Sequence, residues 1–422
     1  FGDSKEGIVK TGSFIGNGNA DGPEINLGWE PQFIITKNAA RSDHWYMFDS
    51  MRGIVSKYND EALYPHSNSD KSLWENLELT STGFKIKSNN VDINGNGEQT
   101  IFLAVRRPDG YVGKPAELGT DVFTMVAGVS IDSSGNPSYI SNGVRDFGIF
   151  RKPASSESWN SFSRLTEGTN ILLNATTDEA TLSVHKAYFN NGMVESAAGD
   201  VTSYQGWMWK RHAGFDQVAY DGNSVQGRPI PHNLGVAPEM IWVKCRFGSD
   251  NWVVAHKGLD GGNAPFTHYL YLNTADAEGD DTYWDDTAPT STHFYVSSGS
   301  KNNASGDKYI SMLFSSVAGI SSVGSYTGNG ATDGSHGITV GFQPRFLIIK
   351  RVDTTGNWNV FDTVRGLGAG VNTLSLNIND SNGQTNQGSG KIGLSSTTFI
   401  PGSGGEAGWN TNSAKYIYYA HA

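Results

Sequence analysis

Carboxylates crowd one stretch of the chain, and residues of this type and density could hold a metal ion. Ca²⁺ is a hard cation that takes about six to eight oxygen ligands. If this stretch binds calcium, we expect the ligands to be Asp276, Glu278, Asp280 and Asp281. Their spacing matches no established ligand pattern, so the alternative is a solvated loop of an acidic protein. Residues 92–97 begin like an EF-hand loop, but Leu103 stands where the glutamate ligand would be.

Carboxylates could also serve in catalysis, as the acid and base pair that flanks a sugar in a glycosidase. Of the repeated acids, Asp49 and Asp362 each precede an arginine by three residues, at Arg52 and Arg365. This step predicts a structural ion pair that holds a loop. The ten histidines are scattered without metal-ligand spacing, and no Gly-x-Ser-x-Gly motif occurs. We therefore expect no enzyme, and a polysaccharide depolymerase is a less favoured alternative.

Aromatic residues in polar loops are the remaining candidates for binding. Such side chains stack on sugar rings or anchor protein interfaces. The four that we expect in this role are Trp74, Tyr283, Trp284 and Trp409. The alternative is that they fold back over the core.

The elements that must position these residues form a repeat. A tryptophan occurs four times, with a bulky apolar residue twelve positions before it and a base eight positions before it. The tryptophans, which we expect in the structural core of each repeat, are Trp45, Trp159, Trp252 and Trp358. The apolar residues are Phe33, Phe147, Met240 and Phe346, and the bases are Lys37, Arg151, Lys244 and Lys350. Self-similarity at a long period is the signature of a repeat array.

The repeat predicts four modules of roughly a hundred residues each. Their expected bounds are 1–110, 111–213, 214–318 and 319–422, and the second is divergent because it lacks the Gly-x-x-Pro turn of the others. A Leu-Asn step matches Leu173-Asn174, Leu272-Asn273 and Leu376-Asn377. No Pro/Ser-rich linker separates the modules, so we expect rigid packing, with independent beads as the alternative.

The composition favours an all-β fold and excludes several functions. Gly accounts for 52 residues, and short apolar runs alternate with Asn-Gly and Asp-Gly turns, which predicts antiparallel β-sandwich or jelly-roll modules. The net charge of −11 argues against nucleic-acid binding. No apolar run approaches the ~20 residues that span a bilayer, so we expect no membrane insertion. The single cysteine, Cys245, excludes an intrachain disulfide and is expected to be a core thiol. Because the sequence starts at Phe1 rather than Met, residues upstream could be missing.

The fourth copy contains the most complete set of the repeated motifs. It runs through Gly324–Gly330, Gly341–Phe346, Trp358–Thr363 and Arg365-Gly366, and the first copy matches at Gly12–Gly18 and the third at Pro231–Met240. These phrases resemble the tandem repeat of phage virion structural proteins, mostly tail-fibre-like, of marine bacteriophages and cyanophages. The resemblance brings no catalytic residues and no cofactor.

The resemblance implies a phage virion structural protein on the outside of the particle. We expect a tail-fibre or adhesin component that contacts the host, with other virion proteins and a host surface glycan as partners. It also implies a homo-oligomer, with a trimer as the form to test. A capsid decoration or head-fibre protein is the alternative, and a secreted bacterial adhesin built on the same repeat is a further one.

Overall fold

The structure of the chain is a computed structural model. It describes residues 7–54, 60–69, 72–108, 116–127, 130–131, 137–166, 169–181, 185–189, 192–195, 203–368, 372–402 and 409–422. Within these ranges almost all regular structure is β-strand, and the helices are single turns. The predicted all-β, antiparallel fold class is confirmed, and the count of four sandwich repeats stays a prediction.

Four large sheets have the same strand order at their centre. In each, the first strand of a stretch of chain pairs with the last, the last pairs with the strand before the repeated tryptophan, and that strand pairs with the strand at the tryptophan. We call the four stretches segments one to four in chain order. The strands, in sheet order, are β1 (Val9–Ile15), β9 (Gln99–Arg106), β3 (Pro31–Asn38) and β4 (Trp45–Asp49) in segment one; β10 (Phe123–Ala127), β19 (Gln205–Trp209), β13 (Phe147–Arg151), β14 (Asn160–Ser163), β15 (Thr169–Leu172) and β16 (Ala180–Thr181) in segment two; β20 (Phe215–Asp221), β27 (Lys308–Phe314), β22 (Met240–Cys245), β23 (Val253–His256), β24 (His268–Tyr271) and β25 (Gly279–Asp280) in segment three; and β28 (Ser321–Thr327), β36 (Lys415–His421), β30 (Phe346–Arg351), β31 (Trp358–Asp362), β32 (Asn372–Asn377) and β33 (Thr385–Ser389) in segment four.

Smaller sheets and single helical turns complete each segment. The small sheets are β2 (Glu24–Asn26), β8 (Gly83–Ile86) and β7 (Leu77–Thr80); β5 (Asp60–Ala62) and β6 (Ser72–Trp74); β11 (Ser130–Ile131), β12 (Pro137–Ile140), β18 (Gly192–Glu195) and β17 (His185–Phe189); β21 (Arg228–Pro231) and β26 (His293–Val296); and β29 (Ile338–Thr339), β35 (Thr398–Pro401) and β34 (Ile392–Leu394). The helical turns are α1 (Val91–Asn94), α2 (Gly119–Val122), η1 (Arg164–Thr166), η2 (Leu259–Gly262), η3 (Pro265–Thr267), η4 (Thr282–Trp284) and η5 (Thr363–Arg365). No helix in the described part of the chain has the length and apolar character needed to cross a membrane.

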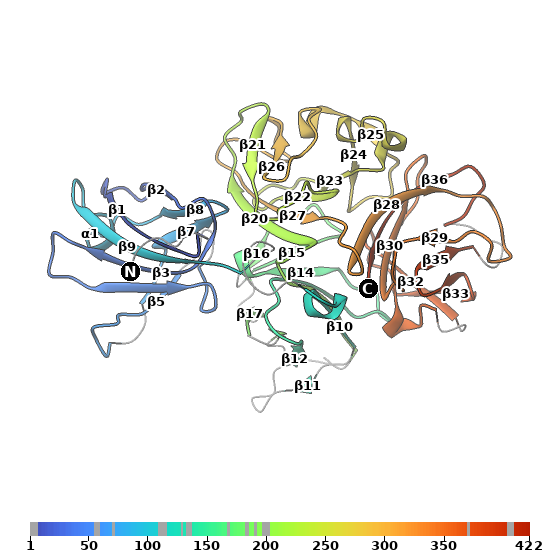
Figure 1. The fold of residues 1–422 in the computed structure, drawn as a ribbon, viewed down its shortest axis with the longest axis horizontal. Helices are drawn as coiled ribbons and strands as arrows, with labels where there is room; N and C mark the ends of the chain where they lie inside the picture. The colour runs from blue at the N-terminus through green and yellow to red at the C-terminus, as the bar shows by residue number, and fades with distance from the viewer. Residues whose placement is uncertain are drawn as a thin grey trace.

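Segments two, three and four pack around a common centre, whereas segment one lies to one side (Figure 1). One aromatic residue from the last strand of each packed segment meets the others there: Trp209, Phe314 and Tyr419. The Phe314 ring lies 5.0 Å from that of Tyr419 and 6.5 Å from that of Trp209, and Trp209 Nε1 donates to the Tyr419 hydroxyl at 3.3 Å. Strands β22 and β30 are therefore buried on both faces, as their continuous apolar runs indicate.

Because three segments meet at Phe314, we expect the stability of all three to depend on this side chain. Replacing Phe314 by alanine leaves a void where three segments meet, and such a change typically costs about 3–5 kcal/mol. We expect Phe314→Ala to lower the free energy of unfolding by that amount in a denaturant titration followed by circular dichroism. The control is Leu118→Ala, at a side chain that is 63% exposed. A loss below about 1 kcal/mol would show that the centre is loosely packed.

Candidate functional site

The repeated tryptophans tie segments two, three and four into a closed ring. Each indole is buried and donates its ring N–H to a backbone carbonyl of another segment. The bonds are Trp252 Nε1 to Leu172 O at 2.9 Å, Trp358 Nε1 to Tyr271 O at 2.9 Å, and Trp159 Nε1 to Asn377 O at 2.7 Å. Segment three thus donates to two, four to three, and two to four, which closes the ring. A buried indole N–H usually finds a hydrogen-bond partner, and at these three positions the partner belongs to a neighbouring segment.

An asparagine fixes the position of each acceptor carbonyl. The asparagine lies two residues after the residue whose carbonyl accepts the neighbour's indole. Its side-chain oxygen accepts a hydrogen bond from the backbone amide of the tryptophan in its own segment. The bonds are Trp159 N to Asn174 at 2.9 Å, Trp252 N to Asn273 at 2.9 Å and Trp358 N to Asn379 at 2.8 Å. The predicted match of Leu376-Asn377 was therefore wrong, and Ile378-Asn379 is the equivalent step. The spacing of 21 residues from the tryptophan, shared with Asn273, identifies it.

The repeated bases close the same interfaces. Each buried cation lies against backbone carbonyls, some in its own segment and some in the neighbour. Lys244 Nζ donates to Thr176 O of segment two at 3.2 Å and to Cys245 O and Gly248 O at 2.8 and 3.0 Å. Lys350 Nζ donates to Ala275 O and Asp276 O of segment three at 3.3 and 2.8 Å and to Arg351 O at 2.7 Å. Arg151 donates to Asp380 O of segment four at 3.0 Å and to Asn382 O. The sequence showed the spacing of these bases but not their role.

The acidic stretch of segment three lies in one of these interfaces. The Glu278 carboxylate accepts a hydrogen bond from the Asp260 amide at 2.9 Å, and the Asp281 carboxylate accepts one from Thr282 N at 2.7 Å. The Glu278 amide donates to Val352 O of segment four at 2.9 Å. No three residues with metal-binding side chains gather in the part of the chain that the structure describes. Asp276 and Glu278 therefore lie in a loop whose backbone contacts segment four, and a calcium site at Asp276, Glu278, Asp280 and Asp281 stays a prediction.

The loop aromatics expected to bind a partner are mostly buried. Tyr283, Trp284 and Trp409 are at most 9% exposed, so they cannot present a ring face, and their expected role is corrected. Trp409 packs edge-on against Phe361 at 4.8 Å. Trp74 differs, because it is 68% exposed. Polar neighbours in sequence misled the prediction, since these loops fold back over the small sheets.

The tryptophan of segment one departs from the other three. Trp159, Trp252 and Trp358 are at most 1% exposed, whereas Trp45 is 37% exposed. The expected core role of Trp45 is therefore wrong in the single chain. Segment one lies outside the ring (Figure 1), and among the described residues its Trp45 face stays partly exposed. The predicted ion pairs are confirmed, with Arg52 Nε and Arg365 Nε at 2.6 and 2.7 Å from Asp49 and Asp362, and Cys245 is buried as predicted.

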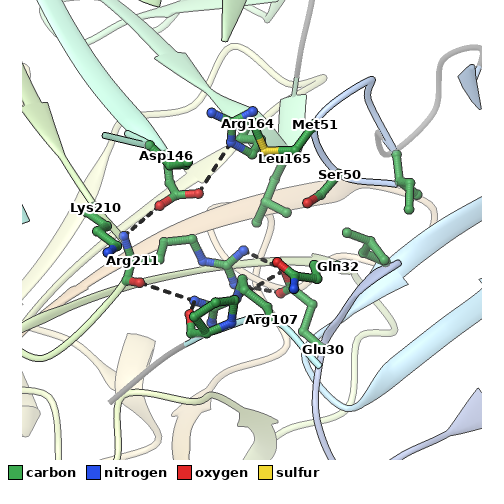
Figure 2. A pocket seen from close by; sticks show the side chains of 14 residues that line it. Glu30, Gln32, Ser50, Met51, Arg107, Asp146, Arg164, Leu165, Lys210 and Arg211 are labelled. Atoms are coloured by element: carbon green, nitrogen blue, oxygen red, sulfur yellow. Dashed lines mark hydrogen bonds and ion pairs between the residues drawn. The ribbon is translucent and has the colours of Figure 1, made fainter. Parts of the chain in front are cut away.

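A charged cavity of about 160 Å³ lies between segment one and segment two (Figure 2). Arg211 is 2% exposed and binds both oxygens of Glu30, at 2.6 and 2.5 Å, and Asp216 at 3.0 Å. Arg107 reaches the same Asp216 oxygen at 3.2 Å. Asp146 accepts from the Arg211 amide at 2.7 Å and lies 3.4 Å from Arg164. Carboxylates and guanidinium groups thus balance one another.

Asp216 and Arg211 keep their charges despite burial. Burial opposes the charge of Asp216, but Arg211 and Arg107 outweigh it and lower its pKa below the usual value. Burial likewise opposes the charge of Arg211, and Glu30 and Asp216 outweigh it and raise its pKa. A carboxylate held in this way cannot act as a general acid near neutral pH. The arrangement is suited to clamping segment one onto the ring.

Segment one also touches segment three directly. Lys308 Nζ of segment three lies 3.3 Å from Glu78 and 2.7 Å from Asp221, and Asn233 Nδ2 donates to Ser81 O at 2.9 Å. A second cavity of about 230 Å³ lies beside these contacts, between β7 and β20. Segment one is thus attached through its edge, away from the sheet face that carries Trp45.

Comparison with known proteins gives one match. Residues 2–107 and 155–422 match the family described as a domain of unknown function, DUF7483. The chain belongs to this family. The DUF7483 match omits residues 108–154, which hold β10 to β13 of segment two, where the repeat also lacks its Gly-x-x-Pro turn. No curated protein and no solved structure matches the chain.

The cavity clamp gives a testable consequence. Glu30→Gln leaves the buried guanidinium groups of Arg211 and Arg107 short of a counter-charge, and breaking a buried pair in this way costs about 3–5 kcal/mol. We expect that loss in the free energy of unfolding, measured by denaturant titration. The matched control is Glu24→Gln, at an exposed carboxylate of the same segment, which should change little. An unchanged stability for Glu30→Gln would contradict the clamp.

The buried Lys350 makes the free energy of unfolding depend on pH. Burial lowers the pKa of Lys350 to about 8, and Asp276 and Asp353 offset this only in part. A lysine in the unfolded chain titrates near 10.4, so between about pH 8 and 10 the unfolded state holds a proton that the folded state has lost. The free energy of unfolding must therefore rise with pH in this window.

We expect this rise to amount to about 1–2 kcal/mol between pH 7.5 and 9.5 for the wild-type chain relative to Lys350→Met. Denaturant titrations across this range measure it. Lys415→Met, at an exposed lysine of the same sheet, is the control and should keep the wild-type profile. Identical slopes for the wild type and Lys350→Met would refute a buried, proton-binding Lys350.

Proposed function

We propose that the chain is a structural protein of a phage particle, a tail-fibre or adhesin component that contacts the host surface. The observation that carries the proposal is the closed ring of segments. In segments two to four the repeated tryptophans and bases bond to a neighbouring segment, and the asparagines orient the tryptophans. A chain whose repeated polar groups serve assembly is suited to building a rigid body. The resemblance of its repeat to tail-fibre-like virion proteins supports the phage setting.

The proposed adhesive contact is carried by segment one. Trp74 is the candidate loop aromatic that stays exposed, at 68%, and an exposed indole can stack on a sugar ring. Segment one projects from the ring (Figure 1), so Trp74 is displayed on the outlying part of the molecule. A host surface glycan is the proposed partner, and many copies on one particle would multiply weak contacts.

Immunogold electron microscopy with antibody against this chain tests the setting. Label on the tail appendages of purified particles is the expected result. Label spread over the head would make the chain a capsid decoration or head-fibre protein instead. Unlabelled particles from the source phage would end the virion proposal.

Host binding tests the adhesive part. We expect Trp74→Ala to weaken binding of the purified chain to host cells by about tenfold or more, because a central aromatic anchor often contributes at least that much. Trp74→Phe keeps a ring and should retain most of the binding. Val236→Ala, at a residue 48% exposed in segment three, is the control outside segment one. Equal binding by Trp74→Ala and wild type would remove Trp74 from the contact.

A further inference from the structure

Within the described residues, segment one leaves partly exposed the sheet face that its sister segments bury. Across β4, β3 and β9, Trp45, Lys37 and Ile101 form one row. The same row is Trp358, Lys350 and Ile417 in segment four. In segment three Lys244 pairs with Ile310, and Trp252 comes directly before Val253, the partner of Val243. The six residues of the sister rows are at most 1% exposed, whereas Trp45 is 37% and Ile101 is 39% exposed.

The next rows of this face are apolar as well. Ile35 pairs with Met47 and Leu103, and Phe33 pairs with Val105. All five side chains are partly exposed. The corresponding positions in segments three and four, which include Trp242, Met312, Ile348 and Tyr419, are buried in the core shared by the ring. A continuous apolar strand face of this kind is typical of a sheet that is covered on both sides.

Lys37 on this face has two of the three kinds of carbonyl acceptor that Lys244 has in segment three. Lys37 Nζ donates to Asn38 O and Arg41 O, each at 2.6 Å. These carbonyls lie one and four residues after the lysine, like Cys245 O and Gly248 O around Lys244. Lys244 has a third acceptor, Thr176 O, which belongs to the neighbouring segment. An ammonium carries three donors, so Lys37 has the geometry of Lys244 with the neighbour's carbonyl still to be added.

Segment one also carries the acceptor side of the contact. The Met47 amide and carbonyl bond to Leu63, and the equivalent residue Val254 is the register partner of Leu270. This register places Tyr64 at the position of Tyr271, whose carbonyl accepts the indole of Trp358. Tyr64 O accepts from Ser67 N at 3.0 Å, and a carbonyl has a second lone pair for an indole.

The residue that orients the tryptophan in this contact is also present in segment one. His66 stands where the sister segments have asparagine, and its Nδ1 lies 3.4 Å from the Trp45 amide. Segment one therefore holds the donor, the acceptor and the orienting group of the ring contact.

We propose that three copies of this chain assemble through segment one, and that their three segments form a ring like that of segments two, three and four within the chain. In this assembly the Trp45 indole donates to Tyr64 O of the next copy, and Lys37 gains a carbonyl from the same copy. The proposal rests on the contacts within the chain and holds whether or not the protein belongs to a phage.

The partners are further copies of this chain, because segment one carries both the donor and the acceptor of the ring contact. Three sister segments with the same Trp–base row already close a ring of three, so the same surface on three identical chains closes by true three-fold symmetry. A three-fold axis brings three identical side chains together, so large aromatic side chains would clash at the axis. The position held by Trp209 and Phe314 in the ring is held by the smaller Val105 in segment one. Symmetric packing of three copies therefore suits this face.

Sedimentation equilibrium of the full chain tests the proposal. We expect a trimer with three times the 45.5 kDa mass of one chain. Trp45→Lys removes the indole and places a charge in the interface, so it should raise the concentration at which the trimer forms by about 100-fold or more. Trp74→Lys is the matched control, because Trp74 is an exposed tryptophan of the same segment outside this face, and it should remain trimeric.

The outcomes are distinct. A monomer or dimer for the wild-type chain at tens of micromolar would overturn the proposal, and a monomer would assign the face to another protein. A trimer that Trp45→Lys leaves intact would also overturn it. If Trp45→Lys does not reach the folded state by circular dichroism, Ile101→Lys, which alters the same exposed row, replaces it. Loss of host binding by Trp74→Ala without loss of the trimer separates this test from that of the proposed function.

Discussion

The hydrogen bond from a tryptophan ring to the backbone of another segment is the interaction on which the structure depends. A buried indole N–H that finds no acceptor has lost its hydrogen bond to water, which costs free energy. In segments two to four that acceptor lies in a neighbour, so each tryptophan is fully satisfied only when the segments are assembled. The repeated lysines and arginine extend the same dependence, because part of their carbonyl contacts also lies across the interface.

The sequence predicted the elements of this arrangement better than their assembly. The fixed offsets of Trp and Lys are visible in one dimension, and the alternation of apolar runs with Gly-rich turns indicated the antiparallel fold. The acceptors are backbone carbonyls, which leave no signature in the sequence, so ring closure could not be inferred. The asparagine that orients Trp358 was also predicted wrongly. Asn377 and Asn379 are the same residue type, and only Asn379 lies 21 residues after its tryptophan, as Asn273 does.

The candidate binding residues were predicted less well because exposure was inferred from polar neighbours. Trp284 and Trp409 lie in polar stretches, yet the small sheets offer apolar surfaces on which they pack. The acidic stretch of segment three looked like a metal loop, whereas its backbone docks on segment four. Trp45 was expected in a core, but it is 37% exposed, and segment one lies outside the ring.

The most direct test is a cryo-electron microscopy structure of the purified full-length chain at side-chain resolution. The central claim is that one contact, tryptophan to carbonyl, closes a ring within the chain and another between chains. We predict three copies related by a three-fold axis through segment one, with the Trp45 indole against Tyr64 of the next copy and segments two to four ringed as described. Separate chains with Trp45 in solvent, or segments two to four apart as independent domains, would contradict the account.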